Sequence, residues 1–146
     1  KKSVTKVKKI KGNCYKIISK SKKTVQYVKP VKKNIISVTI PSSIKLNGKR
    51  YKVTGIAANA FKNCKKLKKV TIGTNVNSIG KRTFYGCSKL RTIKVKTSKL
   101  TGSRVGKQAF KGLNKKAVIK VPKKQLKAYK RLFRAKGVGK KVTIKK

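Results

Sequence analysis

The sequence predicts a single domain of stacked repeats, in which short β-strands alternate with irregular coils. Three observations support this fold class. An apolar pattern recurs around Phe61, Phe84 and Phe110, at intervals of 23 and then 26 residues. Each copy ends in a short strand, and the segments on either side of the copies follow other patterns. A fixed period in the twenties is typical of repeat proteins, whose units bury their apolar faces against one another.

Each copy combines a coil with a strand. Val70–Ile72, Ile93–Val95 and Ile119–Val121 alternate apolar and polar residues, as a strand with one buried face does. The second interval is longer because Thr97–Arg104 forms a larger turn. In the first two copies the coil supplies Ile56, Phe61 and Leu67, then Ile79, Phe84 and Leu90. One such unit cannot bury its own apolar groups, so neighbouring units must stack.

The segment Ile79–Val95 reads I-G-x-x-x-F-x-G-C-x-x-L-x-x-I-x-V. This motif resembles the BspA-like leucine-rich repeat of bacterial surface and secreted proteins. The copies cover roughly half the chain, and the third has Leu113 in place of Cys and Lys116 in place of Leu. The resemblance implies a leucine-rich-repeat solenoid of short strands and irregular or short helical coils. It also implies a secreted or cell-surface location and a role in adhesion or recognition without catalysis, but it identifies no ligand.

Residues 1–37 predict an N-terminal β-hairpin cap. Cys14–Ile18 and Thr24–Val28 alternate, and the polar residues between them are typical of a hairpin connection. The basic segment Lys1–Lys11 contains no apolar run long enough for a signal peptide or a membrane span. Because the chain contains no Met, even at position 1, we expect a processed product or an excised domain.

Residues 38–122 form the repeats, and residues 123–146 predict a C-terminal cap with one α-helix and a final strand, Val142–Ile144. Four apolar residues recur at helical spacing opposite a lysine-rich face, and Gly137 is a natural helix stop. The apolar residues are Leu126, Tyr129, Leu132 and Phe133. A basic amphipathic helix also suits a membrane surface or a calmodulin-like partner, so that reading stays open beside the cap. With Val38–Ile40 as the first strand, we expect about five rungs.

Asn47-Gly48 lies between two alternating runs and predicts a type I′ hairpin. Like charges at Lys45, Lys49 and Arg50 would face one another across its strands, which is unfavourable by a few tenths of a kcal/mol. Two interpretations stay open, a structural spur and a finger that contacts a ligand.

The charge balance limits the chemistry. The 146 residues include 46 Lys plus Arg and no Asp, Glu or His. The chain therefore cannot form paired acid/base carboxylates, a Ser-His-Asp triad or a hard-metal site, and we expect no enzyme, no cofactor and no metal. Repulsion between neighbouring charges in the compact state sums to roughly 10 kcal/mol at physiological salt.

Cys64 and Cys87 occupy the same repeat position. Stacked equivalents can approach disulfide range, but a buried column of small apolar side chains is the alternative that we favour, with free thiols. Cys14 has no evident mate. The spacings of the three do not fit a zinc site.

The remaining possibility is a binding surface for anionic polymers. Side chains in the middle of the strands, Thr39, Thr71, Lys94, Lys120 and Thr143, should project from the exposed face of the sheet. Stacked strands lie about 4.8 Å apart, so charges on this face repeat at a spacing comparable with that of a polyanion. A generally cationic surface without a defined site is the alternative. The candidate polyanion-binding residues are Lys69, Lys94, Lys96, Lys120, Lys141 and Lys145, with Lys45, Lys49 and Arg50 of the hairpin.

Lysine accounts for 40 of the 46 basic residues. Lysine acts as a point charge on phosphate or sulfate, whereas bidentate base recognition favours Arg. The first hypothesis is therefore a surface domain that binds teichoic acid, glycosaminoglycan or mucin glycans. The second is a nonspecific DNA- or RNA-binding protein, and the third is a passive spacer. We expect the isolated domain to be a monomer.

Overall fold

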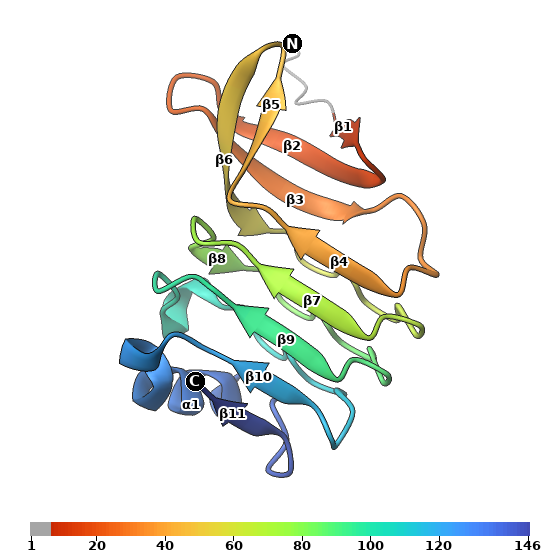
Figure 1. Ribbon diagram of the computed structural model, residues 1–146, viewed down its shortest axis with the longest axis vertical. Helices are drawn as coiled ribbons and strands as arrows, with labels where there is room; N and C mark the ends of the chain where they lie inside the picture. The colour runs from red at the N-terminus through yellow and green to blue at the C-terminus, as the bar shows by residue number, and fades with distance from the viewer. Residues whose placement is uncertain (1–6) are drawn as a thin grey trace.

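The structure is a computed structural model that describes residues 7–146, so the first six residues of the basic segment Lys1–Lys11 lie outside the described residues. Two sheets and one α-helix form an elongated stack, with the first described strands and the C-terminal helix at opposite ends (Figure 1). The mixed sheet has the order β1-β2-β3-β6-β5, with β8 paired to β6. Its strands are β1 (Val7–Ile10), β2 (Asn13–Ser19), β3 (Thr24–Pro30), β5 (Ser43–Leu46), β6 (Lys49–Ile56) and β8 (Ser78–Ile79).

The parallel sheet has the order β11-β10-β9-β7-β4, so each repeat contributes one strand beside the last. Its strands are β4 (Ser37–Ile40), β7 (Lys69–Ile72), β9 (Thr92–Val95), β10 (Val118–Lys120) and β11 (Thr143–Lys145). The pairing aligns one buried row across all five strands, which confirms the expected number of rungs. This row is Val38, Val70, Ile93, Ile119 and Ile144.

A continuous column of aromatic rings runs through the interior. The rings of Phe61, Phe84 and Phe110 are buried, and neighbouring centroids lie 5.3 and 5.4 Å apart. Tyr27 extends the column at one end, 5.3 Å from Phe61, and Phe133 extends it at the other, 4.8 Å from Phe110. The predicted register of the three repeat phenylalanines is therefore confirmed.

The coils opposite the parallel sheet are also in register, because backbone hydrogen bonds join each coil to the next. Phe61 N–H donates to the Thr83 carbonyl and Phe84 N–H to the Ala109 carbonyl, both at 2.8 Å. Each phenylalanine is flanked, two residues before and two after, by residues with positive φ. These are Asn59 and Asn63, Arg82 and Gly86, and Gln108 and Gly112. Two left-handed residues per coil bend the backbone sharply around the buried ring.

Gly80 and Gly106 allow the coils to approach closely. A Cβ on Gly80 would lie 2.3 Å from the Ala58 backbone nitrogen, and one on Gly106 would lie 2.3 Å from that of Lys81. Such distances leave no room for a side chain. The glycine at this position of the second and third copies is thus a packing requirement, whereas the first copy has Ala57 there.

The N-terminal part extends beyond the predicted hairpin. β2 and β3 pair as expected, but β1 adds a third antiparallel strand beside β2. The adjacent lysines Lys8 and Lys9 interrupt the apolar pattern of this edge strand. The Asn47-Gly48 turn has φ values of 52° and 77°, which confirms the type I′ hairpin between β5 and β6.

The C-terminal segment forms the 3₁₀ turn η2 (Lys123–Gln125) and the helix α1 (Leu126–Ala135). Tyr129 and Phe133 are buried, and Gly137 has a φ of 109° where the helix stops. The Tyr129 hydroxyl donates to the Thr97 carbonyl at 2.8 Å and accepts from Leu100 N–H at 3.2 Å. The helix is thereby joined to the longer turn of the second repeat, which also contains η1 (Gly102–Arg104).

The alignment predicted for the final strand is wrong by two residues. The pairing sets Ile144, not Val142, beside Ile119, and Thr143 beside Val118. Val142 is buried as well, so the Val-Thr-Ile pattern fits either alignment. In the observed alignment the Arg134 guanidinium donates to the carbonyls of Gly139 and Val142 and so joins the connection before β11 to the helix. Lys145 therefore takes the mid-strand position expected for Thr143.

Candidate polyanion-binding surface

The exposed face of the parallel sheet carries a straight row of side chains, one from each strand. The strand pairing aligns Thr39, Thr71, Lys94, Lys120 and Lys145. Neighbouring residues along each strand are buried, so the alternation directs this row outward. The first two strands thus present threonine, and the last three present lysine.

Lys94, Lys120 and Lys145 form what we call the lysine row. All three are exposed, and strand spacing places their backbones about 4.8 Å apart. In-register like charges repel one another. No acidic side chain exists in the sequence to neutralise them, so the counter-charge for this row must come from solution.

Two further candidate lysines lie on this face, outside the lysine row. Lys69 pairs with Ser37 and Thr92, one row toward the strand starts. Lys96 follows β9, where its N–H donates to the Ile72 carbonyl at 2.9 Å. The structure therefore brings five of the nine predicted residues together. Lys141 lies in the turn before β11.

The three hairpin cations lie at the other end of the stack. Lys45 pairs with Arg50 across the β5–β6 hairpin, as expected for like charges facing each other. Both line a hollow of about 480 Å³ that also includes Thr39 and Tyr15. The Arg50 guanidinium donates to the Ser43 hydroxyl at 2.9 Å. Two strand spacings, about 10 Å, separate Thr39 from Lys94 in the sheet.

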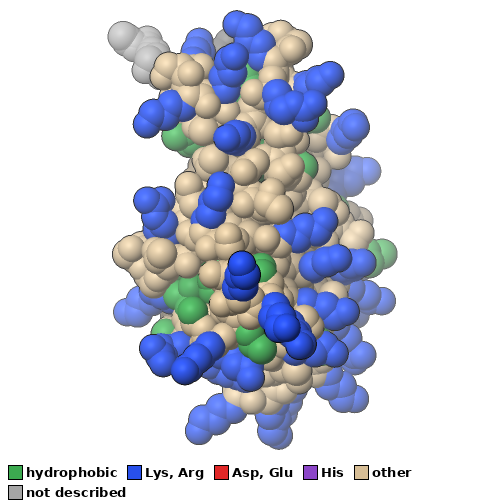
Figure 2. All heavy atoms as spheres, turned by 60° about the vertical axis from the view of Figure 1, so that its left-hand side comes forward, with side chains coloured by type: hydrophobic (Ala, Val, Ile, Leu, Met, Phe, Trp, Pro, Cys, Tyr) green, Lys and Arg blue, Asp and Glu red, His purple; other side chains and the backbone are tan. Residues whose placement is uncertain are grey.

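Sequence reasoning missed a second group of cations beside the end of the sheet. A hollow of about 420 Å³ is lined by Leu126 and five lysines, Lys123, Lys124, Lys127, Lys130 and Lys146. The helical spacing of the α1 lysines was the available signal, but the position of Lys146 depends on the final strand. Elsewhere, lysine and arginine side chains are spread from one end of the stack to the other (Figure 2).

The interior cysteines are shielded from this charge. Cys14, Cys64 and Cys87 are buried free thiols, which confirms the favoured interpretation. The Cys87 thiol donates to the Phe61 carbonyl at 3.0 Å, so this column also links adjacent coils. Burial raises the pKa of Cys87 to about 12 and also raises the pKa of Cys64, an effect that the Lys33 ammonium opposes. Both thiols are neutral at physiological pH.

Residues 7–146 contain no group of three or more His, Cys, Asp or Glu side chains that could hold a metal ion. Within the same residues, no helix is both long and apolar enough to span a membrane.

Comparison with known families identifies the repeat. The BspA type leucine rich repeat region matches residues 31–146 in six copies. The chain belongs to the BspA-type leucine-rich repeat family. The six copies exceed the three recognised in the sequence, and the matched range also contains β4 and β11, which pair in register with the other strands of the parallel sheet.

Solved structures share the leucine-rich-repeat fold. A leucine-rich repeat protein from Bacteroides capillosus is 20% identical, with a TM-score of 0.63, over 94% of this chain and 97% of that one. A leucine rich cell surface protein from Faecalibacterium prausnitzii is 19% identical, with a TM-score of 0.61, over 83% of this chain and 38% of that one.

A leucine-rich repeat protein from Bacteroides ovatus is 23% identical, with a TM-score of 0.55, over 79% of this chain and 37% of that one. This BspA-type chain thus spans well under half the length of the Faecalibacterium and Bacteroides ovatus proteins. The comparison with curated proteins found no match.

Proposed function

We propose that this chain is a non-catalytic, secreted or surface-displayed bacterial domain that binds anionic polymers in adhesion or wall attachment. The lysine row carries the proposal, because three exposed ammonium groups stand in register on a rigid sheet without an acidic side chain. Teichoic acid, glycosaminoglycans and mucin glycans all offer anionic groups at regular intervals. The surface location is supported by the family and by the description of the Faecalibacterium relative as a cell surface protein.

The binding mode is electrostatic. A polymer that lies across the strands would meet Lys94, Lys120 and Lys145 in turn and release its condensed counterions. Lys69 and Lys96 flank that path. Lys141 and the hairpin cations Lys45, Lys49 and Arg50 would contact a longer polymer that runs beyond the row.

The test compares two triple variants of equal charge. K94Q/K120Q/K145Q removes the lysine row, and K20Q/K22Q/K107Q removes three exposed lysines from other loops. Affinity for teichoic acid, heparin and duplex DNA is titrated against salt at matched charge density. Log K falls as log salt rises, and removing the row should make this slope less steep by about two to three. The reason is that each neutralised phosphate contributes nearly one to the magnitude of the slope. The control triple should change the slope by less than about one.

The other outcomes would favour the alternatives to a defined polymer-binding site. Equal weakening by both triples would leave a generally cationic surface and refute the lysine row as a site. Equal affinity for all three polymers would leave nonspecific adhesion, including to nucleic acid. A lack of binding at physiological salt would favour the passive spacer.

We also propose that the chain is one solenoid domain whose two ends act as caps, and that it is monomeric in isolation. The stacking of Tyr27 on Phe61 and of Phe133 against Phe110 supports capping, because it covers the end rings of the repeat column. Sedimentation of the isolated domain at low and high salt tests the monomer.

A further inference from the structure

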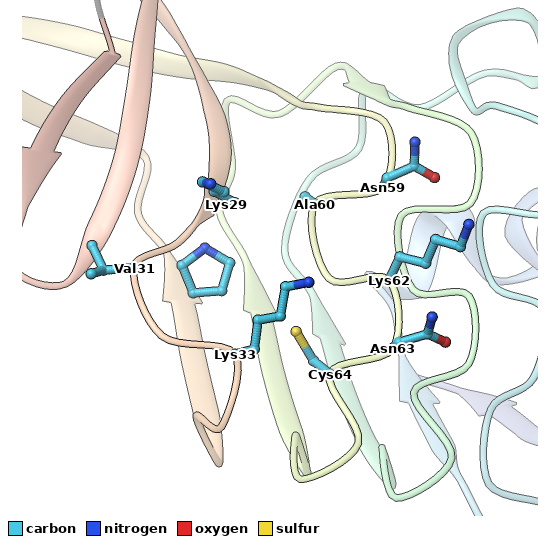
Figure 3. Close-up of a pocket in the computed structure, with 9 residues that line it drawn as sticks. Lys29, Val31, Lys33, Asn59, Ala60, Lys62, Asn63 and Cys64 are labelled. Carbon is cyan, nitrogen blue, oxygen red and sulfur yellow. The ribbon is translucent and has the colours of Figure 1, made fainter.

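A pocket of about 370 Å³ lies between the segment after β3 and the first coil (Figure 3). Pro30, Ala60 and Cys64 supply its apolar lining, and Lys29 and Lys33 supply ammonium groups. The Lys33 side chain extends from its loop toward the first coil, on the side where Cys64 lies (Figure 3).

The other polar side chains of the coil point elsewhere. Asn59, Lys62 and Asn63 leave the coil on its far side (Figure 3). The Lys62 ammonium lies 6.0 Å from the Tyr85 ring centroid, so its charge serves the next coil. Lys29, Lys33 and Lys62 all line the pocket, and Lys33 is the lysine whose side chain extends toward Cys64 (Figure 3).

The first coil has a row of open hydrogen-bond acceptors. In the second coil, Lys81, Thr83 and Tyr85 carbonyls accept N–H groups of the preceding coil at 3.0, 2.8 and 2.8 Å. In the third coil, Lys107, Ala109 and Lys111 carbonyls do the same at 3.1, 2.8 and 3.2 Å. The equivalent carbonyls of the first coil belong to Ala58, Ala60 and Lys62. No donor in residues 7–146 reaches them.

These carbonyls of the first coil lack a donor because β3 pairs with β6 only as far as Tyr27. The Tyr27 carbonyl still accepts Ala57 N–H at 2.8 Å, and Tyr27 pairs with Ile56. Three residues later, where the next donor would stand, the chain has Pro30, which has no N–H. Val31 N–H then donates to the Gly12 carbonyl at 2.9 Å, which turns the chain toward the β1–β2 connection.

We propose that this pocket binds an acidic peptide segment of a partner protein, whose N–H groups pair with the Ala58, Ala60 and Lys62 carbonyls. The acceptors occur at every second residue, and in the stacked coils alternate N–H groups of one coil meet such carbonyls of the next, so a peptide that follows the bends of the first coil would pair in the same way. An acidic side chain in the peptide would pair with Lys29 or Lys33. The peptide must come from outside residues 1–146, which contain no acidic residue. The site is separate from the lysine row.

The probe is a blocked hexapeptide of alternating threonine and glutamate, with two N-methylated isomers of identical charge. One isomer carries methyl groups on the threonine amides and the other on the glutamate amides. In the coil-to-coil pairing only alternate N–H groups face the acceptors, so only one isomer loses the bonding set. We expect that isomer to bind at least about tenfold more weakly, and the other to bind like the parent.

Matched variants locate the site. K33Q should weaken binding of the unmethylated peptide about fivefold, whereas K32Q, on the adjacent exposed lysine, should leave it unchanged. K94Q/K120Q/K145Q should also leave peptide affinity within about twofold, which separates this proposal from the polymer-binding function. In carbonyl-detected NMR, the peptide should shift Ala58, Ala60 and Lys62.

Three results would overturn the proposal. The first is equal binding by the parent and both N-methylated isomers, which would leave charge as the only attraction. The second is carbonyl shifts spread evenly over the coils. The third is an anionic saccharide of equal charge that shifts the same three carbonyls more strongly, which would contradict a peptide ligand.

Discussion

The first two strands of the parallel sheet and the last three share one backbone and one interior but differ on the outside. β4 and β7 present Thr39 and Thr71, where β9, β10 and β11 present lysine. The inward positions are aliphatic throughout. The threonine half favours the strand, because β-branched residues suit it, whereas the lysine half repels itself. The comparison separates the inward residues, which determine the fold, from the outward residues of the sheet, which do not.

The largest effect is expected from a substitution in the aromatic column, which belongs to the interior that both halves share. Phe84→Ala removes the central ring of the aromatic column and should lower the free energy of unfolding by about 3–5 kcal/mol, through lost burial and an interior cavity. Tyr85→Ala, at the half-buried neighbouring position, is the control and should cost much less. Urea denaturation at high salt measures both. Equal costs would contradict a column that supports the stack.

Salt should stabilise the folded protein by screening the repulsion between its surface cations. Raising NaCl from about 0.05 M to about 0.5 M shortens the Debye length and should increase the free energy of unfolding by several kcal/mol. The reason is that 46 cations have no acidic side chain to pair with. Calorimetric melting across this range measures the effect. Sodium sulfate at matched ionic strength shows any additional binding of a divalent anion, and an unchanging Tm would refute self-repulsion as a major cost.

An exchange of outward residues sharpens the comparison. K94T/K120T/K145T extends the threonine row over all five strands and should raise the free energy of unfolding by about 1 kcal/mol at low salt. T39K/T71K extends the lysine row and should lower it by a similar amount. Urea denaturation at low and high salt gives both values. A difference that persists in high salt would point to packing rather than charge.

The smallest effect concerns the shielded cysteines. A raised pKa keeps a thiol protonated, and with a pKa of about 12 only roughly one Cys87 in ten thousand is thiolate at pH 8. Alkylation of the folded protein at pH 8 should therefore be negligible, whereas urea should expose all three thiols. Mass spectrometry of the labelled protein counts them. Rapid labelling of Cys87 in the folded protein would show that the coils open readily.

The periodic part of the fold could be predicted because burial imposes it. Phe61, Phe84 and Phe110 can stack only if the strands between them stay in register, so their spacing fixes both column and sheet. The ends could not be predicted as well. The Val142–Ile144 pattern fits two alignments, and the contacts that accompany the observed one, among them the Arg134 hydrogen bonds to the preceding turn, are not visible in that pattern. Apolar and polar residues in β1 do not alternate clearly enough to predict a strand.

The candidate surface was partly predictable for the same reason. Lys94 and Lys120 follow from strand periodicity, whereas Lys145 required the alignment of β11. The pocket beside Pro30 carries no local signal, because it depends on where β3 leaves its neighbour. Positions that repeat can be read from one copy to the next, while positions that end a repeat depend on contacts distant in the sequence.

The first described strands and the C-terminal helix lie at opposite ends of the stack, and this has a mechanical consequence (Figure 1). Under a force applied along the stack, as in flowing liquid, the coils would detach one after another from an end rather than all at once. Each coil that detaches would release about 23 residues and lengthen the tether by roughly 80 Å. We expect such a chain to unfold in steps under force and to refold one coil at a time when the force falls.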